Sequence, residues 1–182
     1  MNKKIRWITE TAVMLALLLT FQWLGGNIPG QMTKQIVTGS LVNCVLAVSV
    51  LYVGYTSGIA ISLISPIFAY MLGINGVAAA ILPIMAGNTC FVVLLRLICG
   101  KTGKPFWRQI VAWITAACVK FGVMYSLVAW VMCGLMGPVL NFDGKTTKQL
   151  FAMSGINQLF AALIGGALAL SILPVLRKAL KK

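Results

Sequence analysis

The stretch WITETAVMLALLLTFQWLG, residues 7–25, decides the fold class of this chain. It holds a single ionisable side chain, Glu10, close to its start. A mostly apolar helix of about 20 residues crosses the hydrocarbon core of a bilayer, and this stretch has that length. Ala12 and Ala16 are four residues apart, so they lie on one face of the helix. Small residues at this spacing let a second helix approach closely in a membrane, and we predict that this face docks a partner.

The composition of the whole chain agrees with a membrane location. Of its 182 residues, 60% are hydrophobic and 9% are charged, and the mean hydropathy is +0.96. A water-soluble domain has about a quarter of its residues charged. Because there is too little polar surface to cover a water-exposed particle, we predict an integral membrane protein held in the lipid bilayer.

The same length criterion predicts six membrane-spanning helices. These spans cover residues 7–26, 35–54, 57–74, 76–98, 109–136 and 149–176. No tandem repeat or low-complexity tract divides them. We therefore expect an all-α polytopic membrane protein that forms one six-helix domain over residues 1–182.

The lysines and arginines predict the orientation of the spans, because these residues collect in cytoplasmic connections. With the N-terminus in the cytoplasm, eleven of them face inward and three face outward. The inward set is Lys3, Lys4, Arg6, Arg96, Lys101, Lys104, Arg108, Arg177, Lys178, Lys181 and Lys182, and the outward set is Lys34, Lys145 and Lys148. Six spans then leave both termini cytoplasmic.

The net charge of +13 does not indicate a nucleic-acid partner. A basic surface for single-stranded nucleic acid is interleaved with exposed aromatic side chains, whereas the charges here lie beside apolar runs. We expect no nucleic acid to bind.

The residues needed for common enzyme chemistry are also missing from the sequence. It has no histidine, its five cysteines are scattered without metal-ligand spacing, and no GxxxxGK[ST] phosphate loop is present. Glu10 and Asp143, the two carboxylates, lie near opposite faces and cannot act as an acid–base pair. Ser126 and Lys120 are six residues apart, on roughly opposite sides of one helix. We therefore predict no enzyme activity, with no catalytic residue, metal ligand or cofactor.

Lys120 is the most informative single residue, because it lies midway between Trp113 and Trp130 in the fifth span. An ionisable side chain at that depth costs about 3 kcal/mol on the lenient insertion scale and is a candidate for function. No carboxylate is expected at that depth. The ammonium must then meet carbonyls or water, lose its proton, or bind an anion carried by a ligand. Alternatively, it extends along the helix toward an interface.

Other polar side chains are expected at a similar depth in the outer half of the bundle. With a rise of about 1.5 Å per residue, four spans contribute a polar group to one layer. These residues are Asn43, Asn88, Lys120, Asn157 and Gln158. Amides also join helices without binding a ligand, but their convergence at one level predicts a substrate pocket.

In length, six-span layout and the alanine pair within Thr11-Ala-Val-Met-Leu-Ala16, the chain resembles the substrate-binding S component of energy-coupling factor (ECF) vitamin transporters. The resemblance covers the whole chain in layout, but only Ala12 and Ala16 as motif residues. It implies that this alanine face docks onto a transmembrane coupling subunit, which works with two cytoplasmic ATPase subunits. It also implies a vitamin-like ligand bound from outside and a bacterial cell membrane.

If Lys120 meets an anion, a small vitamin or precursor that carries a carboxylate fits better than a cation. Two other functions stay open on the sequence. The chain could be a stand-alone secondary transporter of a small anion, or a membrane scaffold that binds no small molecule.

Overall fold

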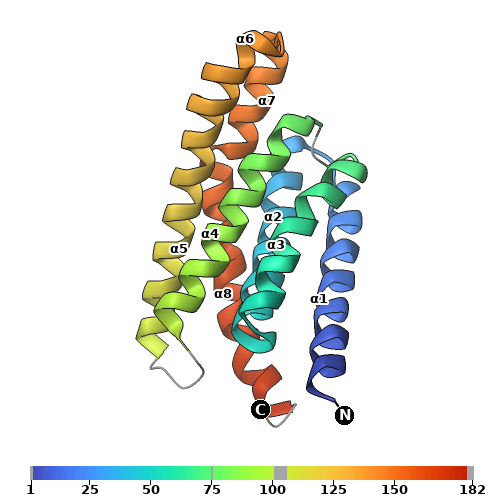
Figure 1. The fold of residues 1–182 in the computed structure, drawn as a ribbon, viewed down its shortest axis with the longest axis vertical. Coiled ribbons are helices and arrows are strands. Elements are labelled where there is room, and N and C mark those ends of the chain that lie inside the picture. The colour runs from blue at the N-terminus through green and yellow to red at the C-terminus, as the bar shows by residue number, and fades with distance from the viewer. Residues whose placement is uncertain (1, 75, 101–105, 180–182) are drawn as a thin grey trace.

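The computed structural model describes residues 2–74, 76–100 and 106–179, which fold as a bundle of helices with no strand among them (Figure 1). The α-helices are α1 (Lys3–Gly26), α2 (Gln31–Val48), α3 (Tyr55–Met71), α4 (Ile81–Cys99), α5 (Phe106–Ser126), α6 (Gly137–Val139), α7 (Gly144–Ser154) and α8 (Ile156–Ala179). Two helices continue as π-helix, α2 over Ser49–Val53 and α5 over Leu127–Met136, and a short 3₁₀ turn at Ala78–Ala80 leads into α4.

Each of the six predicted spans is mostly helical in this bundle, although the last one covers two helices, α7 and α8. Five helical stretches are long and apolar enough to cross a membrane, and these are Lys3–Gly26, Gln31–Val53, Ala78–Cys99, Phe106–Val139 and Gly144–Ala179. The remaining helix, α3, has 17 residues, the lower end of the range for a membrane span. The chain is thus an all-α multi-pass membrane protein, as predicted.

The last span differs from its prediction as a single helix. The chain leaves helical geometry at Gly155, whose backbone is extended, and α7 gives way to α8 at that point. A Cβ atom on Gly155 would lie 2.9 Å from the carbonyl oxygen of Phe151, so the close turn depends on glycine.

Both termini lie at one end of the bundle, together with the end of α4 and the start of α5 (Figure 1). The connection from α1 to α2 lies at the opposite end, where α6 and α7 project beyond the first four helices. This arrangement is the one required for six crossings with both termini on the same side. That this side is cytoplasmic stays a prediction from the charge distribution.

Glycines allow α2 and α8 to pack closely. A Cβ atom on Gly39 would lie 2.9 Å from the Cβ of Ala161, and one on Gly165 would overlap the carbonyl oxygen of Ser40. One residue further on, Gly166 packs against the ring of Trp113, whose Nε1 donates a hydrogen bond to the Ala162 carbonyl (3.2 Å). Without side-chain bulk the backbones approach closely, which is how helices associate when lipid is the solvent.

Candidate binding site

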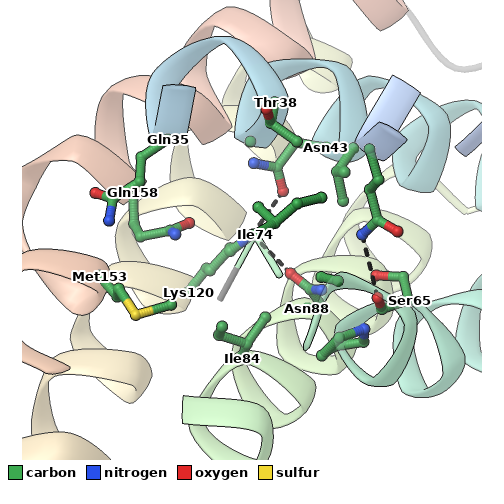
Figure 2. Close-up of a pocket in the computed structure, with 15 residues that line it drawn as sticks. Gln35, Thr38, Asn43, Ser65, Ile74, Ile84, Asn88, Lys120, Met153 and Gln158 are labelled. Atoms are coloured by element: carbon green, nitrogen blue, oxygen red, sulfur yellow. Dashed lines mark hydrogen bonds between the residues drawn. The ribbon is translucent and has the colours of Figure 1, made fainter. Parts of the chain in front are cut away.

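Lys120 lies in the bundle interior and contacts two other helices. Its Nζ donates hydrogen bonds to Oδ1 of Asn43 on α2 (2.6 Å) and to Oδ1 of Asn88 on α4 (2.7 Å) (Figure 2). All three side chains are at most 2% exposed. Nζ also lies 5.6 Å from the centre of the Phe91 ring, within the range of a cation–π contact. Lys120 therefore points inward and does not extend to the membrane surface.

Glycine on α4 makes room for this arrangement. Gly87 precedes Asn88, and a Cβ atom there would overlap the side chain of Met124 and lie 3.4 Å from Cγ of Lys120. The aliphatic part of Lys120 and the side chain of Met124 can therefore pack on the α4 backbone. The ammonium then reaches the amide of Asn88 one position further along.

The positive charge of Lys120 has no counter-charge among the described residues. The sequence holds two carboxylate side chains. Glu10 forms an ion pair with Arg6 at 2.9 Å, and Asp143 caps the start of α7 by accepting the Thr146 N–H. An ammonium has three N–H donors, and two of them meet Asn43 and Asn88. In its protonated form, Lys120 thus combines an unbalanced charge with one spare N–H donor.

A cavity of about 60 Å³ opens beside Lys120, on the side of the α1–α2 connection. Its polar lining comes from six helices, and apolar residues between them complete it. The polar lining residues are Gln22, Gln35, Thr38, Asn43, Ser65, Asn88, Lys120 and Gln158. The space suits a few water molecules, whereas small-molecule pockets usually measure roughly 300–1,000 Å³.

Three buried polar atoms on this lining have no hydrogen-bond partner: Oε1 of Gln22, Oγ1 of Thr38 and Nδ2 of Asn43. The other end of the Gln22 amide is fixed, because Nε2 donates to the Ser65 carbonyl (3.1 Å). An unpaired buried polar group costs about 1–3 kcal/mol. Water or a polar ligand in the cavity removes this cost, so the lining is suited to a polar occupant.

The structure brings together four of the five residues that the sequence placed in a pocket. Asn43 and Asn88 each accept a hydrogen bond from Lys120, and Gln158 lines the same cavity. Asn157 is half-buried on α8 and is not part of the lining. Rotation about the helix axis separates these two neighbours, because adjacent residues on a helix point about 100° apart.

Sequence reasoning missed Gln22, Gln35, Thr38 and Ser65. A signal for two of them is present on α2, where Gln35, Thr38 and Val42 recur at helical spacing and lead to Asn43. Gln22 lies one turn before the end of α1, and its depth alone does not reveal that its side chain turns inward. Ser65 contributes its backbone carbonyl to Gln22, which side-chain polarity does not reveal.

Ala12 and Ala16 lie far from this cavity and are both exposed on α1. The surface between α1 and α3 nearby contains a shallow groove lined by Leu19, Thr20, Trp23, Phe68 and Leu72. The small-residue face of α1 is therefore open to lipid or to another chain. Among the residues that the structure describes, no group of three side chains is suited to hold a metal ion.

Comparison of the chain with known proteins identifies no family to which it belongs and no related protein. No protein-family model, no curated protein and no solved structure gives a significant match to this chain. Its function has therefore to be argued from its own residues.

Proposed function

We propose that this chain is the substrate-binding S component of an ECF-type importer in a bacterial cell membrane. In this role it captures a small vitamin or vitamin precursor from outside. A transmembrane coupling subunit and two cytoplasmic ATPase subunits then complete delivery. The observation that carries the proposal is the unbalanced Lys120 ammonium at the wall of a polar cavity inside a six-helix membrane bundle.

The chemistry of this wall favours an anionic ligand. A buried charge without an opposite charge is unfavourable, and an incoming anion removes that cost. A carboxylate accepts the remaining donor of Lys120, and Nδ2 of Asn43 is a further unpaired donor on the same lining. A cation such as thiamine would instead be repelled by Lys120. The ligand is thus a small molecule with a carboxylate or equivalent anionic group.

The cavity is too small to admit the proposed ligand unless the bundle changes shape. Because about 60 Å³ is smaller than a vitamin needs, the bundle has to widen at the end where α1 joins α2. Ile74, in the α3–α4 connection, and Met153 on α7 both line the cavity on this side. Movement of these segments admits the ligand without separating Lys120 from α2 and α4.

The exposed alanine face of α1 favours the part of the proposal in which the chain binds a partner subunit. Ala12 and Ala16 leave the α1 surface nearly flat, so a second helix can pack on it closely. The sequence contains no phosphate loop, which fits a division of labour in which other chains hydrolyse ATP. A stand-alone secondary transporter of a small anion is the second candidate, because the same buried lysine can couple anion movement without ATP.

Identification of the bound compound tests the proposal. The full-length chain is purified in detergent and denatured, and the released small molecules are identified by mass spectrometry. The identified compound is then titrated back onto the wild type and onto Lys120→Met. We expect the variant to bind roughly 10- to 100-fold more weakly, the loss of one charged hydrogen bond.

Lys148→Met is the matched control, because it removes the same charge from an exposed position on α7, outside the cavity lining. It is expected to bind as the wild type does. Unchanged affinity of Lys120→Met contradicts the site. Uptake by the chain alone in vesicles, without ATPase subunits, favours the secondary transporter.

A further inference from the structure

Three arginines converge at the end of the bundle that carries both termini. Arg96 lies in the last turn of α4, Arg108 in the first turn of α5 and Arg177 in the last turn of α8. All three are within electrostatic reach of the buried Cys99 sulfur. Like charges gathered in this way repel one another, so the cluster favours the approach of an anion.

Most of the hydrogen-bonding capacity of this cluster is not used within the described residues. Arg108 donates from Nε to the Ile98 carbonyl (2.7 Å), and Arg96 donates from Nη1 to the Gly100 carbonyl (3.3 Å). These two bonds satisfy carbonyls at the end of α4, a usual role for arginine at a helix C-terminus. Each guanidinium has five N–H donors, so four remain on each. Nε of Arg177 is buried and has no hydrogen-bond partner among residues 2–74, 76–100 and 106–179.

No carboxylate side chain balances the three arginines. Asp143 lies at the start of α7, near the opposite end of the bundle (Figure 1). Glu10 is on α1, where it is paired with Arg6. Among the described residues, therefore, no acidic side chain is paired with the three arginines to balance their charges.

The surface around the cluster is suited to lipid. Leu97, Phe106, Trp107 and Val175 are between 62% and 68% exposed, and each lies within two residues of one of the three arginines. Tryptophan at this level is typical of the membrane–water interface. A molecule bound to the guanidinium groups thus has an apolar surface directly beside it.

We propose that Arg96, Arg108 and Arg177 form a binding site for the phosphate group of an anionic membrane lipid. Guanidinium groups bind phosphate oxygens through paired hydrogen bonds, and Nε of Arg177 supplies a donor that nothing else occupies. The acyl chains of the same lipid lie along the exposed apolar side chains. Free phosphate shares the headgroup chemistry but gains nothing from that apolar surface. This site is separate from the Lys120 cavity and does not depend on the proposed transport function.

Native mass spectrometry of the full-length chain in detergent tests this site. Phosphatidylglycerol and phosphatidylcholine of identical acyl chains are added in turn, and bound copies are counted. We expect the wild type to retain phosphatidylglycerol preferentially. Arg177→Gln should weaken this binding about fivefold, the effect of one basic residue at a lipid surface.

Arg6→Gln is the matched control, since Arg6 is on a different helix and already paired with Glu10. It should bind phosphatidylglycerol as the wild type does. Equal loss in Arg6→Gln and Arg177→Gln, or no preference for phosphatidylglycerol over phosphatidylcholine, overturns the proposal.

Two further measurements test whether the guanidinium geometry matters beyond its charge, and whether the bound phosphate belongs to a lipid. Arg177→Lys keeps the charge and the fold but loses the planar donor pair, so its phosphatidylglycerol binding should fall between those of the wild type and Arg177→Gln. Wild-type binding by Arg177→Lys overturns the guanidinium recognition. Inorganic phosphate in large excess should leave phosphatidylglycerol bound, and its displacement assigns the site to free phosphate and overturns the lipid proposal.

Discussion

Gly165 on α8 lies directly against Asn43 on α2, the residue that accepts a hydrogen bond from Lys120. A Cβ atom at position 165 would come within 2.7 Å of the Cβ of Asn43 and 3.0 Å of the backbone nitrogen of Cys44. The close packing of two helices and the placement of the central lysine therefore share one contact. A change at Gly165 acts on the binding site without touching its polar atoms.

Gly165→Ala should destabilise the bundle and weaken binding at the cavity together. The added methyl group has to push α2 away, and overpacking of this kind costs about 1–3 kcal/mol in the free energy of unfolding. Thermal unfolding in detergent, together with titration of the compound released from the wild-type protein, measures both effects. Gly122→Ala on α5 is the control, because a Cβ atom there meets nothing within 4 Å. A wild-type melting temperature for Gly165→Ala contradicts the contact.

Asn88→Asp should move stability and binding in opposite directions. It places a carboxylate where an amide oxygen now lies 2.7 Å from Nζ of Lys120, and supplies the missing counter-charge inside the protein. We expect the ligand-free protein to gain about 1–3 kcal/mol, less than the roughly 3–5 kcal/mol lost when a buried ion pair is broken. Binding of an anionic ligand should be lost, because its place beside the ammonium is taken.

The control for this variant is Asn157→Asp, which makes the same change on α8 outside the cavity lining. It adds a carboxylate that does not face Lys120, so no gain in melting temperature is expected. Stabilisation by both variants to the same extent would show that the gain does not come from Lys120.

Ala12→Leu and Ala16→Leu should separate partner docking from folding. Both positions are exposed, so each variant should change the free energy of unfolding by no more than about 0.5 kcal/mol. The larger side chains should prevent close approach of a partner helix, and the coupling and ATPase subunits should no longer co-purify. Ala167→Leu repeats the substitution at an exposed position of α8 and should leave co-purification unchanged. Full recovery of the subunits with Ala12→Leu and Ala16→Leu excludes this face as the docking site.

Asp143 should make a small contribution to the free energy of unfolding that depends on pH. Hydrogen bonds from the Thr146 side chain and then from its backbone N–H lower the pKa of this carboxyl below its ordinary range. A lowered pKa stabilises the folded state above the ordinary aspartate value of about 4, and this contribution is lost as the pH falls through the lowered value. Asn at position 143 still caps α7 but does not titrate. The drop in melting temperature on acidification should therefore be smaller in Asp143→Asn than in the wild type, and equal drops contradict the assignment.

The helices could be predicted from the sequence because each span is long, apolar and bounded by polar or glycine-rich connections. The step at Gly155 could not, since residues 149–176 read as one apolar run and the close contact with the Phe151 carbonyl is a property of the folded backbone.

For the cavity, depth alone predicted that Asn43, Asn88 and Lys120 would lie at one level. Depth does not fix rotation about a helix axis, which separates Gln158 from Asn157. It also does not reveal Gln22, whose amide is oriented by the Ser65 carbonyl of another helix. In spans that are apolar on every side, periodicity carries little information on which face turns inward.

Two of the three protons on the Lys120 ammonium hold α2 and α4 to α5. An anion that accepts a hydrogen bond from the third N–H adds a bond and breaks none, so the hydrogen bonds of Lys120 to α2 and α4 are kept when the cavity is filled. Under the proposed function, ligand recognition then proceeds without loosening the contacts that join these three helices.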